Sequence, residues 1–270
     1  MKKIQLTLLF AILLGINSHI VAQSTDAKNK VKVDFGVDLY SRYVWRGTQL
    51  GGNSPSLQSS LSASYGNFEV GAWSAYSLGG IHSAQEMDLY LSYSFLNELF
   101  TAIITDYYFP TEDAPYNYFD YNKGSTGHVL EAGVSFNGTK EIPFSFSAYM
   151  NFFGADAIRL NNNPASLNFN KKTGIQYSNY FELDYNTSTQ KVDISLFVGA
   201  TLSKPQKANA NIGFVGESGY YGKEPGIVNL GITASRSVKI TKYYSVSLSA
   251  SLITNPQAKT VFLVFGTKLE

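Results

Sequence analysis

Few residues of this chain are placed to catalyse a reaction, and the pair His82 and Ser83 is the strongest candidate. A serine beside a histidine is the beginning of a nucleophilic site, in which the imidazole accepts the hydroxyl proton. Such a site also needs a third group that orients the histidine, and adjacent residues at a loop tip seldom supply that geometry. The pair is kept as a hydrolase hypothesis, no catalytic residue is assigned, and the chain is predicted not to be an enzyme.

Charged side chains form a second candidate set, because several recur at every second residue. Glu86 and Asp88 are one such pair, and Glu182 and Asp184 are another. An extended strand places residues i and i+2 on the same face, so the two carboxylates of each pair share a face. Carboxylates gathered on one wall favour cations. Their chemistry therefore depends on the elements that carry them.

Composition excludes several classes of site and of partner. There is no cysteine, which removes disulfides, thiolate zinc sites and cysteine nucleophiles. A formal net charge of +1 argues against a nucleic-acid partner. No metalloprotease, phosphate-binding or dinucleotide motif is present, so neither a metal nor a cofactor is expected. Charged residues make up only 15% of the chain and aromatic residues 14%, a mixture that suits one face in lipid and one in water.

The first residues are typical of a secretory signal peptide. Lys2 and Lys3 precede an apolar stretch over 4–16, and Ala22 is a suitable last residue before cleavage. A transmembrane helix needs about 20 apolar residues, and this stretch is shorter. We expect a signal peptide over 1–22, a periplasmic tail over 23–31 and one domain over 32–270.

Apolar and polar residues alternate from Lys32 onward, which indicates strands with one apolar face. The pattern predicts strands of up to fifteen residues, where about 9–11 suffice to cross a bilayer when tilted. The expected ranges are 32–46, 56–65, 68–77, 84–95, 99–109, 128–136, 143–153, 174–185, 191–201, 226–235, 243–253 and 260–269.

The connections alternate between short turns and long loops. The short ones include Gly66-Asn67 and the turn that contains Asn137-Gly138, both of which suit hairpins. This sorting predicts an all-β protein, a transmembrane antiparallel up-and-down β-barrel of about 12 strands with both termini periplasmic. Aromatic residues at the ends of the apolar faces, such as Tyr65 and Phe68 at one end and Tyr43 and Trp45 at the other, are expected to form two interfacial girdles.

The polar faces are then predicted to line the lumen. Arg42 is expected to face carboxylates such as Asp88, Asp106 or Glu131, and small residues between the charges leave room for a narrow passage. A salt-bridge network that closes the lumen is an equal alternative. The candidate lumen-lining residues are Asp38, Arg42, Arg46, Glu69, Glu86, Asp88, Asp106, Glu131, Glu182 and Asp184.

Two further features concern the long loops. The loop 110–127 holds tyrosines beside acids, which could stack on sugars, fold into the pore or pack on the barrel rim. His128, at a strand start, suggests an interfacial or loop contact. Loops 154–173 and 202–225 are rich in Asn, Lys and Gly and carry no recognisable motif.

The segment 41–50, SRYVWRGTQL, resembles the TorF-like porins, also described as the Gcw_chp family of Gram-negative bacteria. The resemblance is specific over 32–110 and implies an outer-membrane barrel with a channel role, though no particular substrate. Barrels inserted by the outer-membrane assembly machinery usually end in an aromatic residue, whereas the last aromatic here is Phe265. The positions that match the family pattern are Ser41, Tyr43, Trp45, Arg46, Gly47, Pro55, Gly71 and Trp73.

Three functions follow as hypotheses. The first is a narrow porin of the cell outer membrane that passes small solutes or ions with mild cation preference. The second is a structural or adhesive barrel with a closed lumen and partner-binding loops. The third is a barrel-embedded lipid hydrolase at His82 and Ser83. The expected partners are outer-membrane lipid, the assembly machinery and the solutes themselves.

Overall fold

The computed structural model describes residues 30–79, 85–110, 117–242 and 244–269. The signal segment 1–22 and nearly all of the tail 23–31 lie outside these residues. The described part consists of strands and one short 3₁₀ turn, Ala210–Ile212. Its long strands are β1 (Lys32–Tyr40), β4 (Ser56–Tyr65), β5 (Phe68–Ser77), β6 (Gln85–Phe95), β7 (Phe100–Tyr108), β8 (His128–Phe136), β9 (Phe144–Gly154), β12 (Asn179–Ser188), β13 (Asp193–Thr201), β14 (Gly226–Lys239), β15 (Ser245–Asn255) and β16 (Thr260–Leu269).

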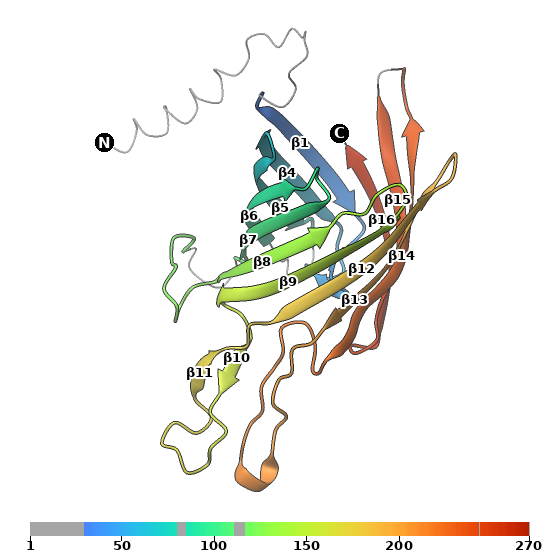
Figure 1. Ribbon diagram of the computed structural model, residues 1–270. Helices are drawn as coiled ribbons and strands as arrows, with labels where there is room; N and C mark the ends of the chain where they lie inside the picture. Colours follow the sequence, from blue (N-terminus) through green and yellow to red (C-terminus); the bar gives the residue numbers. More distant parts are fainter. Residues whose placement is uncertain (1–29, 80–84, 111–116, 243, 270) are drawn as a thin grey trace. The chain divides into compact units, whose positions relative to one another are not determined.

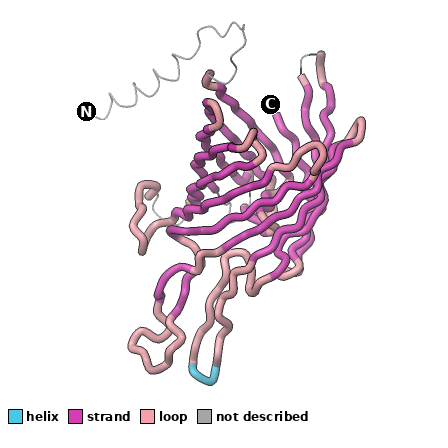
Figure 2. The backbone as a smooth tube through the Cα atoms, viewed as in Figure 1, coloured by secondary structure: helices cyan, strands magenta, loops and turns pink. Residues whose placement is uncertain are grey.

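These twelve strands close into one barrel, as Figures 1 and 2 show. The order around the ring is β1-β16-β15-β14-β13-β12-β9-β8-β7-β6-β5-β4, so strands that follow one another in the chain are neighbours. All neighbouring pairs are antiparallel, and β1 closes the ring by pairing with both β4 and β16. The predicted twelve-stranded antiparallel up-and-down barrel is confirmed. Among the described residues, no helix is long and apolar enough to cross a membrane.

The outer surface of the barrel is apolar along every strand. In water such a surface would be unstable, because large apolar residues would remain solvated around the whole circumference. In a bilayer the same residues would contact acyl chains, and closure gives every long strand a neighbour on both sides. One exposed apolar residue from each strand in chain order illustrates the band: Phe35, Leu61, Val70, Leu91, Ile104, Val134, Met150, Leu183, Leu196, Ile232, Leu252 and Leu263.

Aromatic rings form a continuous row at the short-turn end of the barrel. Phe68 packs against Tyr93 with ring centroids 4.6 Å apart, and the row continues through Phe95, Phe100 and Phe136 with neighbouring centroids at most 6.4 Å apart. Such rings favour the boundary between acyl chains and headgroups. The row therefore marks one edge of the membrane-spanning band.

The first strand is shorter than expected. The pattern over 32–46 predicted one strand, but β1 ends at Tyr40 and the chain bends at Ser41 and Arg42. The remainder forms a separate hairpin of β2 (Tyr43–Trp45) and β3 (Thr48–Leu50). Alternation cannot reveal this break, because both pieces are extended and keep the same period.

The long connections lie at the end of the barrel opposite the Gly66-Asn67 turn, and both ends of the barrel sequence lie at the turn end. One long connection carries a second hairpin, β10 (Ile158–Leu160) with β11 (Lys172–Ile175). This hairpin and the loop 202–225 both protrude from the barrel (Figure 1). The strand predicted over 174–185 therefore begins later, at Asn179.

Candidate functional site: the lumen and its constriction

The connection between β1 and β4 folds across the lumen. Arg46 and Gly47 form the turn of the β2–β3 hairpin with φ angles of +47° and +76°. Two positive φ angles are typical of a type I′ turn, which matches the twist of a hairpin. Gly47 also lies too close to β14 for a side chain, because a Cβ there would be 2.0 Å from the Val228 carbonyl oxygen. The tip also contacts Glu131 on β8, five strands from β1 around the ring, so the hairpin reaches across the interior.

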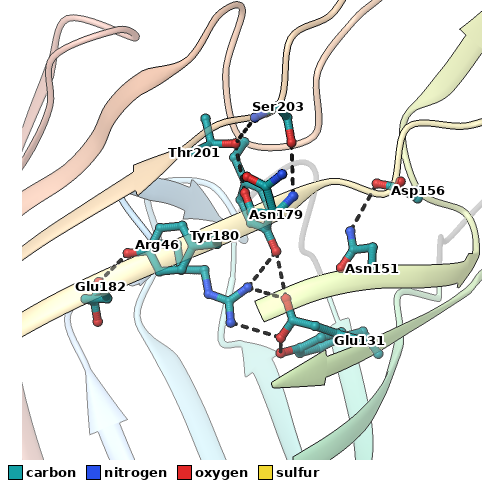
Figure 3. Close-up of polar contacts among 11 residues, drawn as sticks. Arg46, Glu131, Asn151, Asp156, Asn179, Tyr180, Glu182, Thr201 and Ser203 are labelled. Carbon is teal, nitrogen blue, oxygen red and sulfur yellow. Dashed lines mark hydrogen bonds and ion pairs between the residues drawn. The ribbon is translucent and has the colours of Figure 1, made fainter. Parts of the chain in front are cut away.

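Arg46 ends in a buried ion pair with Glu131 on β8. Its Nη1 and Nη2 donate to the two carboxylate oxygens of Glu131 at 2.5 and 2.9 Å, as Figure 3 shows. The Glu131 side chain is only 1% exposed. It also accepts hydrogen bonds of 2.8 Å from the hydroxyls of Tyr107 and Tyr221. A bidentate pair with further donors is the arrangement that compensates two charges for losing water.

Four aromatic rings surround the Arg46 guanidinium. Its central carbon lies 4.3 Å from the ring centroid of Tyr149, 4.5 Å from those of Trp45 and Tyr180, and 5.5 Å from that of Tyr221. A guanidinium within about 6 Å of an aromatic ring is attracted to its face. Burial raises the pKa of the Tyr221 hydroxyl, which keeps it protonated as a donor to Glu131. These rings and Glu131 are called the Arg46 cage below.

Glycines position two of the cage rings. Gly133 on β8 and Gly199 on β13 face inward, and an added Cβ would overlap the rings of Tyr149 and Tyr180 respectively. A ring that lies over a strand glycine covers the exposed backbone and is held flat against the sheet. The same arrangement recurs along the inner wall: Tyr90 over Gly71, Phe197 over Gly231 and Tyr40 over Gly266.

Four other inward-facing carboxylates, Asp38, Glu69, Glu182 and Asp184, have local partners. Each of the four accepts from a hydroxyl on its own or a neighbouring strand, and the described part of the inner wall holds no continuous ladder of ion pairs. Tyr40 donates to Asp38 at 3.4 Å, Tyr90 donates to Glu69 at 2.9 Å, and Ser145 donates to Asp184 at 3.3 Å. Glu182 accepts from the Tyr180 hydroxyl and, at 2.8 Å, from the side-chain amide of Asn229.

Glu86 and Asp88 lie side by side on the inner face of β6, both buried. Asp88 is paired in register with Trp73 on β5, whose ring lies 5.6 Å from the ring of Tyr43 in the hairpin. The hairpin therefore covers these two carboxylates on one side of the lumen, as it covers Glu131 on the other. Tyr43 and Trp45 were expected in a lipid-facing girdle; that expectation is wrong, because their segment turns inward after Tyr40.

Two expected lumen residues lie elsewhere. Asp106 is on the outer face, because β7 pairs Asp106 with the lipid-facing Leu89 and Tyr107 with the inward-facing Asp88. The sequence of β7 has apolar residues at both parities, Ile103 and Ile104 among them, so alternation did not fix its orientation. Arg42 donates to Gln49 Oε1 at 3.1 Å within the hairpin, and Arg46 is the arginine that reaches Glu131.

Outside the barrel, Asp106 belongs to a buried cluster around His128. His128 Nδ1 lies 2.7 Å from Asp106 Oδ1, and Nε2 lies 2.5 Å from the Tyr118 carbonyl oxygen. Tyr121 stacks on the imidazole with centroids 4.2 Å apart and donates to Asp106 at 2.7 Å. The described part of loop 110–127 thus packs on the outer rim of the barrel. His82 and Ser83 lie outside the described residues, as do Glu112, Asp113 and Tyr116 of this loop.

Polar contacts fasten the protruding loops to the long-loop ends of the strands. Asn151 donates to Asp156 at 3.1 Å, and the backbone of Asn179 donates to Ser203 Oγ at 3.0 Å (Figure 3). Further out, the buried Glu217 accepts from the backbone of Leu160 and from that of Gln206, both at 2.9 Å. The β10–β11 hairpin and the loop 202–225 therefore form one protruding unit.

The opposite end of the lumen is more open. A hollow of about 840 Å³ lies at the short-turn end, bordered by the turn 137–143 and by β9, β12, β13 and β14. Inward-facing Ser195, Thr233 and Ser235 line part of it. The barrel is thus hollow and polar at one end and crossed by the hairpin at the other.

Sequence reasoning placed Arg46 and Glu131 in the lumen but did not pair them, and it missed the cage tyrosines. Tyr149 and Tyr180 fall on an inward face that was read as polar, and Tyr221 is in a loop without a motif. The Arg-Gly turn signal next to Trp45 could have indicated a hairpin, since two residues with positive φ often join two short strands.

A closed barrel with an apolar exterior and a polar interior defines the class of membrane-embedded β-barrels. The chain belongs to the family described as "Bacterial protein of unknown function (Gcw_chp)", whose model matches residues 24–213. Two solved structures are similar. One is titled "KdgM porin" (TM-score 0.43, 9% identity, 87% of this chain and 98% of that chain covered). The other comes from work on the in-meso crystallization of membrane proteins (TM-score 0.41, 8% identity, 87% and 83% covered). No curated protein matches the chain.

Proposed function

We propose that this barrel is a narrow outer-membrane channel that passes small solutes or ions with a mild preference for cations. The observation that carries the proposal is the asymmetry of the lumen. Its short-turn end is hollow and lined in part by small hydroxyl side chains, whereas a single hairpin, Tyr43–Leu50, crosses the other end. A barrel of twelve strands is intermediate between those filled by side chains and those with a wide channel, so one loop can decide whether it conducts.

The charges of the inner wall support the preference for cations. Five carboxylates face inward and form no ion pair with a lysine or arginine of the described residues: Glu69, Glu86, Asp88, Glu182 and Asp184. Rings of carboxylates in a pore concentrate cations and repel anions. The charge of Arg46, in contrast, is compensated by Glu131.

The test is conductance in planar bilayers. Wild-type protein is expected to give small channels, and a variant in which residues 42–54 are replaced by a short Gly-Ser turn is expected to conduct several-fold more. The matched control replaces residues 161–170, the loop that joins β10 to β11 outside the barrel, and should conduct like the wild type. In a KCl gradient the reversal potential should indicate a preference for cations. Combining Glu182→Gln and Asp184→Asn should reduce that preference. Absence of channels in both wild type and hairpin variant, or anion selectivity, would refute the proposal.

A second candidate function has its own supporting observation. The protruding unit of the β10–β11 hairpin and the loop 202–225 is held together by Glu217, Asn170 and Gln176. A fixed protrusion suits an adhesive barrel that binds a partner through its loops. If the hairpin variant does not conduct, and removal of the protrusion abolishes attachment of cells to a surface, this second function is favoured.

A further inference from the structure

We infer that the Arg46 cage is a binding site for a guanidinium group, and that a solute carrying such a group can take the place of Arg46. The inference rests on the proposed function in one respect, because displacement of Arg46 would release the hairpin from the lumen. It identifies a class of ligand, a planar organic cation, that the channel recognises.

The polar part of the cage matches a guanidinium in shape and charge. Glu131 presents both oxygens to Nη1 and Nη2, and the Tyr221 hydroxyl accepts a further hydrogen bond of 2.5 Å from Nη1. Tyr221 and Tyr107 in turn donate to Glu131, which fixes the orientation of the carboxylate. A planar fork of donors fits this pair of oxygens, whereas an ammonium group cannot occupy both with the same geometry.

The apolar part of the cage belongs mainly to the barrel. Tyr149 is on β9 and Tyr180 on β12, both held over glycines, and Glu131 is on β8 between them and β7. Of the four rings, only Trp45 moves with the hairpin. Departure of Arg46 would therefore leave three rings and a buried carboxylate in place, and a buried carboxylate without a cationic partner is strongly unfavourable. The site demands a cation whether or not the hairpin supplies it.

The hairpin that fills the site is held under backbone strain. Arg46 has φ +47°, a conformation that residues with a Cβ adopt at a cost. The contacts of the guanidinium compensate this strain. A free guanidinium makes the same contacts without the strained turn, so competition for the cage favours release of the hairpin.

The experiment measures binding of methylguanidinium chloride by isothermal titration calorimetry of the detergent-solubilised protein. Arg46→Ala empties the cage and should bind the probe saturably in the millimolar range or tighter. Adding Glu131→Gln should weaken that binding at least tenfold. Arg42→Ala is the matched control: this arginine is in the same segment but outside the cage, so the variant should resemble the wild type. Urea, which has a similar shape but no charge, should not bind.

If Arg46→Ala does not fold, Arg46→Gln supplies a side chain for the turn without a charge and is tested in the same way. Hydrogen exchange of residues 43–50 in the wild type should also increase on adding methylguanidinium and not on adding sodium chloride. Equal binding by the variants with and without Glu131, or no saturable binding to any variant with an empty cage, would overturn the inference. Calorimetry requires no channel activity, so binding without conductance would contradict the proposed function alone.

Discussion

Glu217 is a single residue that connects the two segments of the protruding unit. Its side chain is fully buried and accepts from the backbone of Leu160 and of Gln206, with Arg159 Nη1 3.4 Å away. Each buried hydrogen bond contributes about 1 kcal/mol, and leaving its donor unpaired costs about 1–3 kcal/mol. The carboxylate thus replaces the strand pairing that these segments lack.

We predict that Glu217→Ala opens the protruding unit and leaves the barrel intact. The expected loss is about 2–4 kcal/mol of local stability, because two buried N–H groups lose their acceptor. Amide hydrogen exchange of residues 158–160 and 204–207 measures it. The control is Glu224→Ala, whose carboxylate pairs with Lys207 at 3.0 Å at an exposed position and should contribute at most about 1 kcal/mol. Equal protection in both variants would show that Glu217 does not join the segments.

The face of the strand on which most lumen residues lie could be predicted from the sequence, but the residues that they contact could not. Alternation placed Arg46 and Glu131 inside because a strand has period two. The contact between them depends on a bend at Ser41 and Arg42 and on the path of the hairpin across the barrel. A local turn signal can indicate the hairpin, but it does not specify that path. For Asp106 the predicted face itself is wrong. Its strand carries apolar residues on both faces, and only the pairing with β6 fixes the orientation of the strand.

At the scale of a strand, consecutive residues of β6 face the lipid and the lumen in turn. Leu91 is exposed on the outer surface, and Ser92 faces inward opposite Glu69. Both lie well inside β6, away from its ends. The strand therefore allows the same substitution to be compared in two environments one residue apart.

Leu91→Lys is expected to destabilise the barrel by about 2–4 kcal/mol, the cost of a lysine near the bilayer midplane. Ser92→Lys should change stability by about 1 kcal/mol or less, because the ammonium group faces water and Glu69. Urea unfolding in lipid vesicles measures the stability of both variants. The fraction of folded barrel is read from its heat-modifiable mobility in electrophoresis. A larger loss for Ser92→Lys would reverse the assignment of faces.

At the scale of the whole barrel, the absence of cysteine allows its sidedness to be tested directly. We predict that the protruding loops face the cell exterior and the short turns the periplasm. Leu167→Cys, at a position 97% exposed between β10 and β11, should react with a membrane-impermeant maleimide in intact cells. Lys140→Cys, in the turn between β8 and β9, should react only after lysis. The reverse pattern would place the barrel in the opposite orientation.

The barrel is closed by its least extensive strand pair. β16 meets β1 only over Val37–Tyr40, whereas β4 pairs with β1 along the full length Lys32–Tyr40. Opening free energies are lowest where few hydrogen bonds hold an element, so thermal fluctuations should separate the barrel first along this seam, from its short-turn end. The hairpin enters the lumen from the far end of β1 and is anchored on β8, remote from the seam. The barrel wall can therefore loosen sideways, toward lipid, while the passage along its axis stays blocked.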